Sequence, residues 1–242
     1  MTTKKTKIQT KNIYSNKIYL NTNSNWHQED SPFKMSVIKK MIKKNNIKFN
    51  TCADVGCGAG LITELLSKAY PDIAFVGFDL SKDVCLFWEK RTKRKNLKFI
   101  NGDVFDFDKS FDLILCLDVF EHIEDYFRFL KKLKKSGRKF IFNIPLDMNV
   151  MKVITNGIKL ARTEVGHLHY FNEYTALETL KDCGFKVIDS FLSTAFLSVP
   201  PRNIRQLAVL PLRLFTLIFG KSFGAKIFGG QSLVVYAEIN NI

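Results

Sequence analysis

Short apolar runs alternate with amphipathic segments along the chain from residue 51 onward. Strand-like apolar runs lie at 51–55, 73–78, 97–100, 111–117 and 139–144. Segments with helical spacing of apolar residues lie between or after them, at about 59–69, 82–94, 121–135 and 173–183. Strands that alternate with helices form βαβ units, so the pattern predicts an α/β fold with a mostly parallel, doubly wound sheet and helices on both faces.

The C-terminal part of the chain departs from this alternation. Gly184 ends the last helical segment, and apolar runs at 185–191 and 232–239 follow without a full helical crossover between them. They predict a closing antiparallel pair, which gives a sheet of about seven strands whose last strand is antiparallel. An apolar insertion at about 194–230 separates the two strands and is longer than a hairpin needs.

The stretch 204–219 within this insertion is strongly apolar, but it is too short and too interrupted to cross a membrane. We expect it to pack on the sheet as a substrate lid. The alternative is peripheral membrane contact through 204–228, in which basic side chains face the lipid headgroups. The interrupting and basic residues are Arg205, Pro211, Arg213, Lys221 and Lys226.

Residues 1–30 are polar, which predicts a flexible N-terminal segment before a single domain at 31–242. Ser31 and Pro32 match a helix N-cap followed by proline at the first helical position, and an amphipathic helix is expected after them. The N-terminus lacks the apolar stretch of a secretory signal, so we expect a cytoplasmic protein, with the inner face of the membrane as the alternative.

Composition narrows the class of protein. Apolar residues make up 46% and charged residues 25%, which excludes a mainly disordered chain. The five cysteines are scattered without a C-x-x-C pair, so neither a disulfide framework nor a zinc site is indicated. The net charge of +14 gathers largely in lysine-rich clusters at 39–44, 90–95 and 131–139. We interpret these as solvated helix faces in preference to a surface for nucleic acid, membrane or a phosphorylated substrate.

The clearest candidate site is a glycine loop directly after the first strand, D-V-G-C-G-A-G at 54–60. Glycines at alternate positions let the backbone approach a ligand, and the free N–H groups of the following helix face the crevice. Dinucleotide-binding proteins use the spacing G-x-G-x-x-G, but here the third glycine comes one residue early and Leu61 stands in its place. This spacing disfavours a nicotinamide oxidoreductase.

Two further acids follow predicted strands. Asp79 ends the run that begins at Phe75, and Asp103 follows the run at 97–100. The carboxyl ends of parallel strands share one edge of a sheet, so the loop and both acids define one ligand crevice. We expect Asp79 to accept the hydroxyls of a ribose and Asp103 to meet an adenine amino group.

With these features the chain resembles the class I S-adenosylmethionine-dependent methyltransferases over about residues 30–240. Residues 113–123 are similar to the fourth-strand motif of that class, D-V-x-E-H. The subgroup it resembles contains bacterial small-molecule methyltransferases, including those of ubiquinone-type and surface-polysaccharide pathways. The segments similar to this subgroup are Trp26-His27, 31–34, 144–147 and 166–170.

The resemblance implies a Rossmann-like fold and S-adenosylmethionine as methyl donor, with S-adenosylhomocysteine as product. It also implies a small-molecule acceptor, for which the apolar insertion favours an amphiphilic, lipid-linked or sugar-linked compound. In similar enzymes a basic residue near Lys34 meets the methionine carboxylate, and the backbone near Leu117 borders the methionine. The expected cofactor-binding residues are Lys34, Asp54, Gly56, Cys57, Gly58, Gly60, Asp79, Leu80, Asp103, Val104 and Leu117.

Methyl transfer by in-line displacement requires the acceptor, the carbon and the sulfur to be collinear, and a hydroxyl acceptor also requires a general base. The candidate bases are His122, His167 and His169. For His122 the alternative role is to cap the following helix. In a strand the last two would share a face and could line one pocket. A metal site would need a third ligand besides the two histidines, and only Asp147 or Glu164 could supply it. Neither acid forms a compact motif with the histidines, so we expect no bound metal.

Two other functions stay open. The positive charge suits a methyltransferase for tRNA or rRNA, but the fourth strand is not followed by an N-P-P-Y motif, and no RNA-binding module is recognisable. Nucleic acid is therefore disfavoured as a partner. A non-catalytic regulator that binds S-adenosylmethionine is the second alternative, because a fold does not establish a function.

Overall fold

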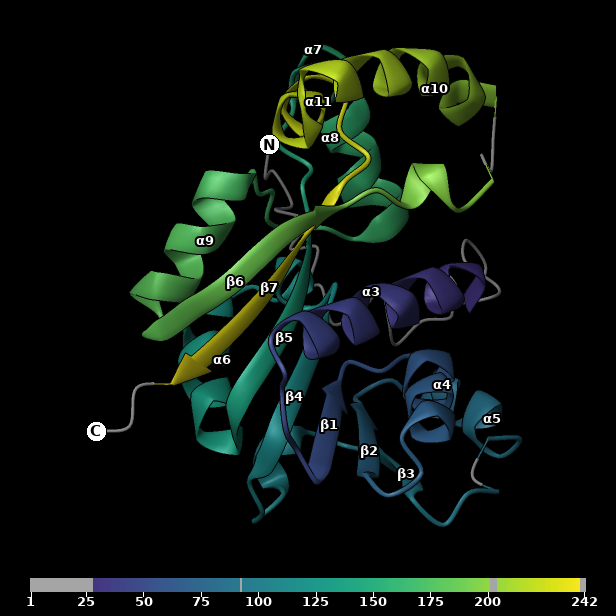
Figure 1. Ribbon diagram of the computed structural model, residues 1–242, viewed down its shortest axis with the longest axis vertical. Helices are drawn as coiled ribbons and strands as arrows, with labels where there is room; N and C mark the ends of the chain where they lie inside the picture. The colour runs from purple at the N-terminus through teal and green to yellow at the C-terminus, as the bar shows by residue number, and fades with distance from the viewer. Residues whose placement is uncertain (1–27, 92, 201–203, 240–242) are drawn as a thin grey trace, which may run out of the picture.

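A seven-stranded sheet forms the centre of the protein, as the computed structural model shows for the described residues 28–91, 93–200 and 204–239. The strands are β1 (Thr51–Val55), β2 (Ala74–Asp79), β3 (Leu97–Asn101), β4 (Phe111–Leu117), β5 (Gly137–Pro145), β6 (Phe185–Ser193) and β7 (Ser232–Ile239). They lie in the order β3-β2-β1-β4-β5-β7-β6 (Figure 1). β1 to β5 run parallel, and β7 is antiparallel to both its neighbours, which confirms the predicted sheet.

β4 illustrates why the parallel strands have no polar side. Leu113 and Leu115 pack in the core on one face of the sheet, whereas Ile114 and Cys116 pack in the core on the other. All four are almost completely buried. Because both faces of the sheet are covered, the strand carries a continuous apolar run instead of alternating apolar and polar positions.

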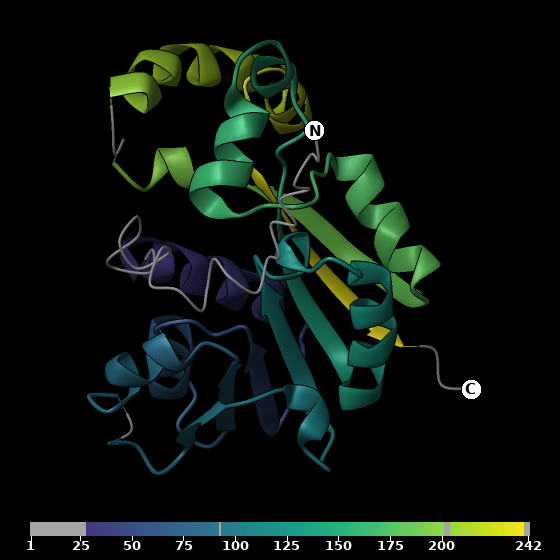
Figure 2. The same cartoon turned by 180° about the vertical axis from the view of Figure 1, so that it is seen from behind.

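Four helices cover the two faces, α3 and α4 on one and α6 and α9 on the other (Figures 1 and 2). Their bounds are α3 (Ser31–Lys44), α4 (Leu61–Ala69), α6 (Tyr126–Leu133) and α9 (Glu173–Asp182). Met41 of α3 and Leu66 of α4 join the core that contains Leu113. Leu130 of α6 and Leu180 of α9 join the opposite core. The doubly wound architecture therefore follows from helices with one apolar stripe packing on both sides of an apolar sheet.

The strand order creates a crevice at the carboxyl ends of the parallel strands. From β1 the chain proceeds outward to β2 and β3, and then returns to the other side of β1 as β4. The connections on the two sides of β1 diverge at this switch point, where ligands bind in open α/β sheets. The loops after β1, β2, β3 and β4 therefore meet in one place.

Two predicted helices are shorter than their patterns suggest. The segment 82–94 contains a 3-10 turn and α5 (Cys85–Trp88), and the described residues of the basic run after it form turns and bends instead of a continued helix. Adjacent like charges weaken a helix, and Arg91 turns inward to Glu64 instead. In the segment 121–135, the Asp125 side chain accepts a bond from the Arg128 N–H, so α6 begins only at Tyr126.

The start of α3 also differs from the prediction. Ser31 is the first helical residue, and Asp30 precedes it as the N-cap without a side-chain capping bond. Residues 28–30 form the 3-10 turn η1 (Gln28–Asp30), whereas the rest of the predicted flexible segment, with Trp26 and His27, lies outside the described residues.

A cap of short helices lies over the carboxyl edge of the sheet, at the top of Figure 1. It consists of α7 (Val150–Ile154), α8 (Gly157–Leu160), the π turn Ala161–Val165, α10 (Ile204–Thr216) and α11 (Lys221–Ile227). The sequence pattern did not predict the helices of 150–165, because five-residue helices are too short to show an apolar period.

The expected lid on the sheet is wrong for α10. This helix contacts α11 and the 3-10 turn η8 (Leu217–Phe219), and none of its described side chains before Thr216 is buried. Within the described ranges, every helix is too short or too polar to cross a membrane.

Candidate active site

The glycine loop after β1 has the conformation that its sequence requires. Gly56, Gly58 and Gly60 have φ angles of +72°, +53° and +75°, which L side chains rarely adopt. A Cβ on Gly56 would lie 2.7 Å from Cγ2 of Val119, and a Cβ on Gly60 would lie 2.5 Å from the ring of Phe99. The loop is thus a cradle of bare backbone at the crevice, which fits a ligand that approaches the main chain closely.

Both predicted acids stand beside this loop. Asp79 ends β2, and its Oδ2 accepts a 2.8 Å bond from the Gly58 N–H while Oδ1 accepts one of 2.8 Å from the Ser81 N–H. Burial raises the pKa of Asp79, against the effect of these backbone donors. Asp103 follows β3 and accepts a 3.0 Å bond from the Phe105 N–H. Each carboxylate keeps further lone pairs for a ligand.

Two side chains that sequence reasoning missed hold the loop from outside. Nε1 of Trp88 donates a 2.9 Å bond to the Gly58 carbonyl, and Nε of Arg91 donates a 2.8 Å bond to the Ala59 carbonyl. Trp88 also stacks on Phe99, with ring centroids 5.2 Å apart. No local motif marks these contacts, because each joins segments that are distant in the sequence.

The loop and the acids line a cavity of about 1290 Å³, which also extends to β4 and the cap. It contains all but two of the predicted site residues. Those that line it are Lys34, Gly56, Cys57, Gly58, Gly60, Asp79, Leu80, Asp103, Val104, Leu117, His122 and His167.

Asp54 and His169 do not line this cavity. Asp54 is buried beneath the loop, where its Oδ2 accepts a 2.6 Å bond from the Thr63 hydroxyl and burial raises its pKa to about 7. His169 turns away, with Nε2 2.9 Å from the Ile123 carbonyl and its ring against Tyr126. The predicted shared face of His167 and His169 is wrong because residues 166–172 form no strand.

Lys34 of α3 lies at the cavity wall and forms a 2.5 Å ion pair with Asp118. Burial opposes the charge on Lys34, but Asp118 outweighs it and raises the pKa of Lys34 above its usual value. Asn143 donates a 2.7 Å bond to the other oxygen of Asp118. The ammonium is therefore fixed at the cavity by charge pairing.

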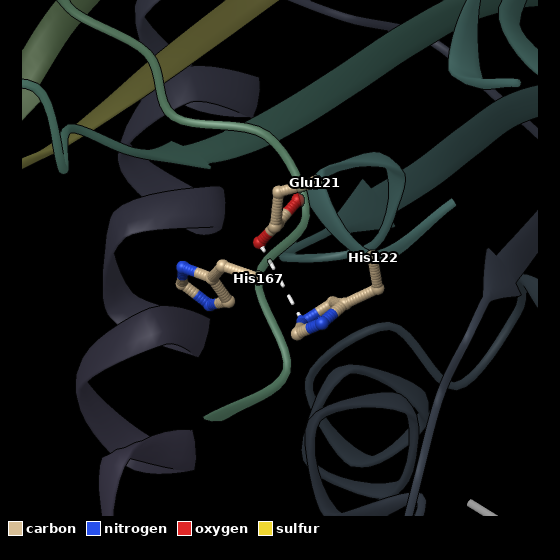
Figure 3. Close-up of side chains that lie close together, drawn as sticks. All are labelled: Glu121, His122 and His167. Atoms are coloured by element: carbon tan, nitrogen blue, oxygen red, sulfur yellow. Dashed lines mark ion pairs between the residues drawn. The ribbon is translucent and has the colours of Figure 1, made fainter. Parts of the chain in front are cut away.

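Three ionisable side chains meet at the end of β4 (Figure 3). Glu121 and His122 follow β4 in the 3-10 turn η4 (Phe120–His122), and His167 comes from the loop before α9. Their potential ligand atoms all lie within 4.8 Å of one another, so this group could hold a metal ion. The metal site considered from the sequence, with both His167 and His169 as ligands, is not formed, because His169 points away.

Burial controls the charge of this group. Glu121 is completely buried, and neither of its carboxylate oxygens has a hydrogen-bond partner in the part of the chain that the structure describes. Burial and the neighbouring Asp118 raise the pKa of Glu121 well above its usual value. Burial and the neighbouring His167 lower the pKa of His122 to about 4. His122 is therefore neutral at pH 7.

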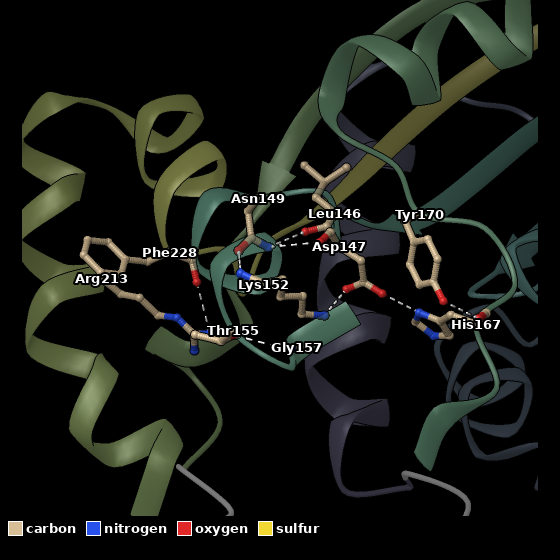
Figure 4. Close-up of polar contacts among 10 residues, drawn as sticks. All are labelled: Leu146, Asp147, Asn149, Lys152, Thr155, Gly157, His167, Tyr170, Arg213 and Phe228. Carbon is tan, nitrogen blue, oxygen red and sulfur yellow. Dashed lines mark hydrogen bonds and ion pairs between the residues drawn. The ribbon is translucent and has the colours of Figure 1, made fainter. Parts of the chain in front are cut away.

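Asp147 fixes the orientation of His167 (Figure 4). Its carboxylate bonds to Nδ1 of His167 with one oxygen and to Nζ of Lys152 with the other. Burial opposes ionisation, but the bond with His167 and the charge of Lys152 outweigh it and lower the pKa of Asp147 to about 2. An ionised carboxylate only accepts, so Nδ1 of His167 carries the hydrogen and Nε2 is left as the basic nitrogen.

The topology, the glycine loop after β1 and the acids after β2 and β3 define the class I S-adenosylmethionine-dependent methyltransferase fold. Residues 53–139 match the sequence model of a family described as "Methyltransferase domain". This part of the chain, which includes the glycine loop, Asp79 and Asp103, is therefore similar to that family.

Curated relatives share this part of the chain. A ubiquinone biosynthesis O-methyltransferase of Pelagibacter ubique is 35% identical over 117 residues, which cover 45% of this chain and 46% of the relative. One of Rickettsia bellii is 31% identical over 123 residues, which cover 47% and 51%. The chain thus spans about half the length of these relatives.

Solved structures match most of the chain at low identity. The plantazolicin methyltransferase BpumL, in complex with S-adenosylhomocysteine, has a TM-score of 0.64 at 14% identity, with 96% of this chain and 94% of that chain covered. The magnesium protoporphyrin IX methyltransferase of Synechocystis PCC 6803 has a TM-score of 0.57 at 16% identity, with 91% and 86% covered. These matches establish the fold alone.

Proposed function

We propose that this protein is an enzyme that transfers a methyl group from S-adenosylmethionine to a small-molecule acceptor. One observation carries this function: the glycine cradle and Asp79 share a cavity with His122 and His167. Residues that suit a nucleoside follow β1 to β3, and residues that suit proton transfer follow β4 and β5. Donor and acceptor can therefore meet at the switch point of the sheet.

The donor half of the cavity supports S-adenosylmethionine. When bound, this cofactor supplies an electrophilic methyl group on a positively charged sulfur. Asp79 accepts the ribose hydroxyls with lone pairs that the loop leaves free, and Asp103 accepts from the adenine amino group. Lys34 keeps donors beyond its pair with Asp118 and binds the methionine carboxylate.

The acceptor half contains a base. Nε2 of His167 would take the proton of the acceptor hydroxyl, and the oxygen would keep the electron pair of that O–H bond. The cofactor would supply the methyl group, whose bond to sulfur would break with its electron pair going to sulfur, so that S-adenosylhomocysteine is the leaving group. Asp147 holds the ring and stabilises the imidazolium that forms. His122 is the second candidate base, because it lines the same cavity in the neutral state.

An amphiphilic, lipid-linked or sugar-linked acceptor fits the remaining walls. Val37, Pro145, Val165, Ala195 and Val234 give this part of the cavity apolar surface next to the histidines. The names of the two relatives refer to O-methylation in ubiquinone biosynthesis, which supports an oxygen acceptor. Peripheral membrane contact through 204–228 would bring the cavity to such a compound.

The proposal is tested in two measurements. Titration calorimetry should show that the protein binds S-adenosylhomocysteine. Asp79→Ala should weaken this binding at least tenfold, about 1.4 kcal/mol. Asp182→Ala, at an exposed position of α9, should leave the affinity unchanged. Lipid and aqueous extracts incubated with methyl-labelled S-adenosylmethionine should then give a labelled small molecule.

The outcomes separate the alternatives. Binding without any labelled product would favour a non-catalytic regulator, and label in RNA would favour the nucleic-acid methyltransferase. Absence of S-adenosylhomocysteine binding would exclude all three functions.

A further inference from the structure

The cap exposes an unusual amount of apolar surface at one end of the molecule. Ile204 and Ile218 are 77% exposed, and Ile154 of α7 is 70% exposed. Contiguous exposed apolar patches on a soluble domain mark interaction sites. We call this patch the cap surface, and its members are Val150, Val153, Ile154, Ile204, Leu207, Leu212, Leu214, Phe215, Ile218, Phe219 and Phe223.

Two segments that are distant in the sequence build the cap surface. α7 contacts α11, and both views of the molecule place α7 beside α10 and α11 at the end beyond the sheet (Figures 1 and 2). Phe215, Phe219 and Phe223 form a ladder of rings with centroids 5.5 and 5.6 Å apart. All three rings stay exposed, so this ladder is not a buried core.

Basic residues outnumber acidic ones around the cap surface. Residues 148–165 contain three lysines and arginines and one acid, Glu164, and residues 194–230 contain five lysines and arginines and no acid. The chain as a whole has 23 acidic residues beside 37 basic ones, so the single acid beside eight basic residues sets these two segments apart. A second copy of the same surface would oppose this charge with like charge, which disfavours self-association through the cap.

We propose that the cap surface docks on an anionic lipid bilayer. Apolar and aromatic side chains of a peripheral helix enter the boundary between headgroups and acyl chains, while lysines and arginines attract the anionic headgroups. Lys221 and Lys226 flank Phe223 on α11 and supply that charge. The docking surface includes α7, which reaches beyond the segment 204–228 that the sequence indicated.

Docking in this way places the cavity close to the bilayer. Val165, at the end of the π turn, and Ala195, just after β6, line the cavity and connect directly to cap segments. A lipid-embedded acceptor could then enter without crossing bulk water. The docking itself does not depend on the proposed methyl transfer, since it rests on the exposed cap surface.

Vesicle flotation of the full chain tests the docking. We expect flotation with vesicles of phosphatidylcholine mixed with phosphatidylglycerol, and much less with phosphatidylcholine alone or at high salt. Phe215→Ser with Phe219→Ser, and separately Lys221→Gln with Lys226→Gln, should each lower the partition coefficient at least about tenfold.

Matched variants away from the cap control for surface composition. Leu86→Ser changes a side chain that is 71% exposed on α5, and Lys39→Gln with Lys43→Gln changes exposed lysines on α3. Both should float like the unchanged protein, and all variants should keep the same affinity for S-adenosylhomocysteine. If the unchanged protein did not bind S-adenosylhomocysteine, the proposed function would be rejected, but the docking result would stand.

The proposal is overturned if the unchanged protein stays off anionic vesicles, or if the cap variants float as well as the controls. Light scattering measures the oligomeric state and so tests whether a second copy of the chain occupies the cap surface. A dimer that the phenylalanine variants dissociate would assign the cap surface to a second copy and reject docking on a bilayer.

Discussion

The imidazole rings of His122 and His167 meet edge to face in the cavity, with centroids 4.8 Å apart. His122 follows β4, and His167 comes from the loop before α9, so two separate connections place their rings together. Asp147 holds only the second ring. The two histidines therefore differ in their surroundings: His122 is a buried neutral ring, whereas a carboxylate fixes the orientation of His167.

Replacement of Asp147 by asparagine should lower kcat by about 10²–10⁴-fold, because an amide can present its N–H to Nδ1 and favour the wrong tautomer of His167. KM and the affinity for S-adenosylhomocysteine should change little. Rates across pH, measured with the acceptor that the labelling experiment identifies, should show a changed acidic limb in Asp147→Asn. Asp147→Glu should recover part of the rate, whereas a rate near that of the unchanged protein in Asp147→Asn would reject Asp147 as a positioning residue.

His122 should make the folded protein less stable at acid pH. Burial lowers its pKa from 6.5 to about 4, so between these values the unfolded chain binds more protons than the folded one. The free energy of unfolding therefore falls as pH drops from 6.5 toward 4, and this residue contributes up to about 3 kcal/mol of that fall. Urea unfolding of His122→Gln and the unchanged protein at several pH values should show a smaller fall in the variant; identical pH dependence would contradict it.

Asp54 should change the pH dependence of the free energy of unfolding in the opposite direction to His122. Burial raises its pKa from 3.8 to about 7, so the folded chain binds the extra proton and loses stability as pH rises through this window. The amide of an Asp54→Asn variant would be neutral and could still accept the bond from Thr63. Relative to the unchanged protein, this variant should gain on the order of 2–4 kcal/mol between pH 4 and pH 8. Thermal unfolding at both ends of the window measures this difference, and a constant offset would refute the shifted pKa.

Gly56→Ala should weaken cofactor binding beyond its effect on stability. An alanine at φ +72° costs about 1–2 kcal/mol of folding free energy, and its Cβ would also press on Val119 in the cavity wall. Gly184→Ala is the matched control: its φ is +81°, but a Cβ there would meet only the flexible end of Lys134. Both variants should lose similar stability in urea, while only Gly56→Ala loses at least about tenfold in affinity for S-adenosylhomocysteine. Equal affinities would show that the loop does not approach the ligand.

The cofactor half of the site was accessible from the sequence because its signals are local. The glycine spacing and the acids Asp79 and Asp103 each follow a strand directly, and the parallel sheet brings all strand ends together. Asp54 lies beneath the loop and does not line the cavity. A residue at a strand end can point below the loop as readily as into the crevice, and Thr63 decides this by its hydrogen bond.

The acceptor half was less accessible because its contacts are long-range. His169 is two residues from His167, yet its ring packs on Tyr126 and leaves the cavity. Asp147, which the sequence offered only as a possible metal ligand, instead pairs with His167 and Lys152. Trp88 and Arg91 support the loop from a segment whose pattern suggested only a continuous helix.

The sequence by itself determined the order of strands and helices, the glycine loop and the acids beside it, because apolar periodicity and backbone conformation are properties of neighbouring residues. Tertiary structure alone decided which polar groups share the cavity, how burial shifts their pKa values, and that α7 joins α10 and α11 in one exposed apolar surface. Those features depend on packing between segments that lie far apart in the chain, and no local pattern records it.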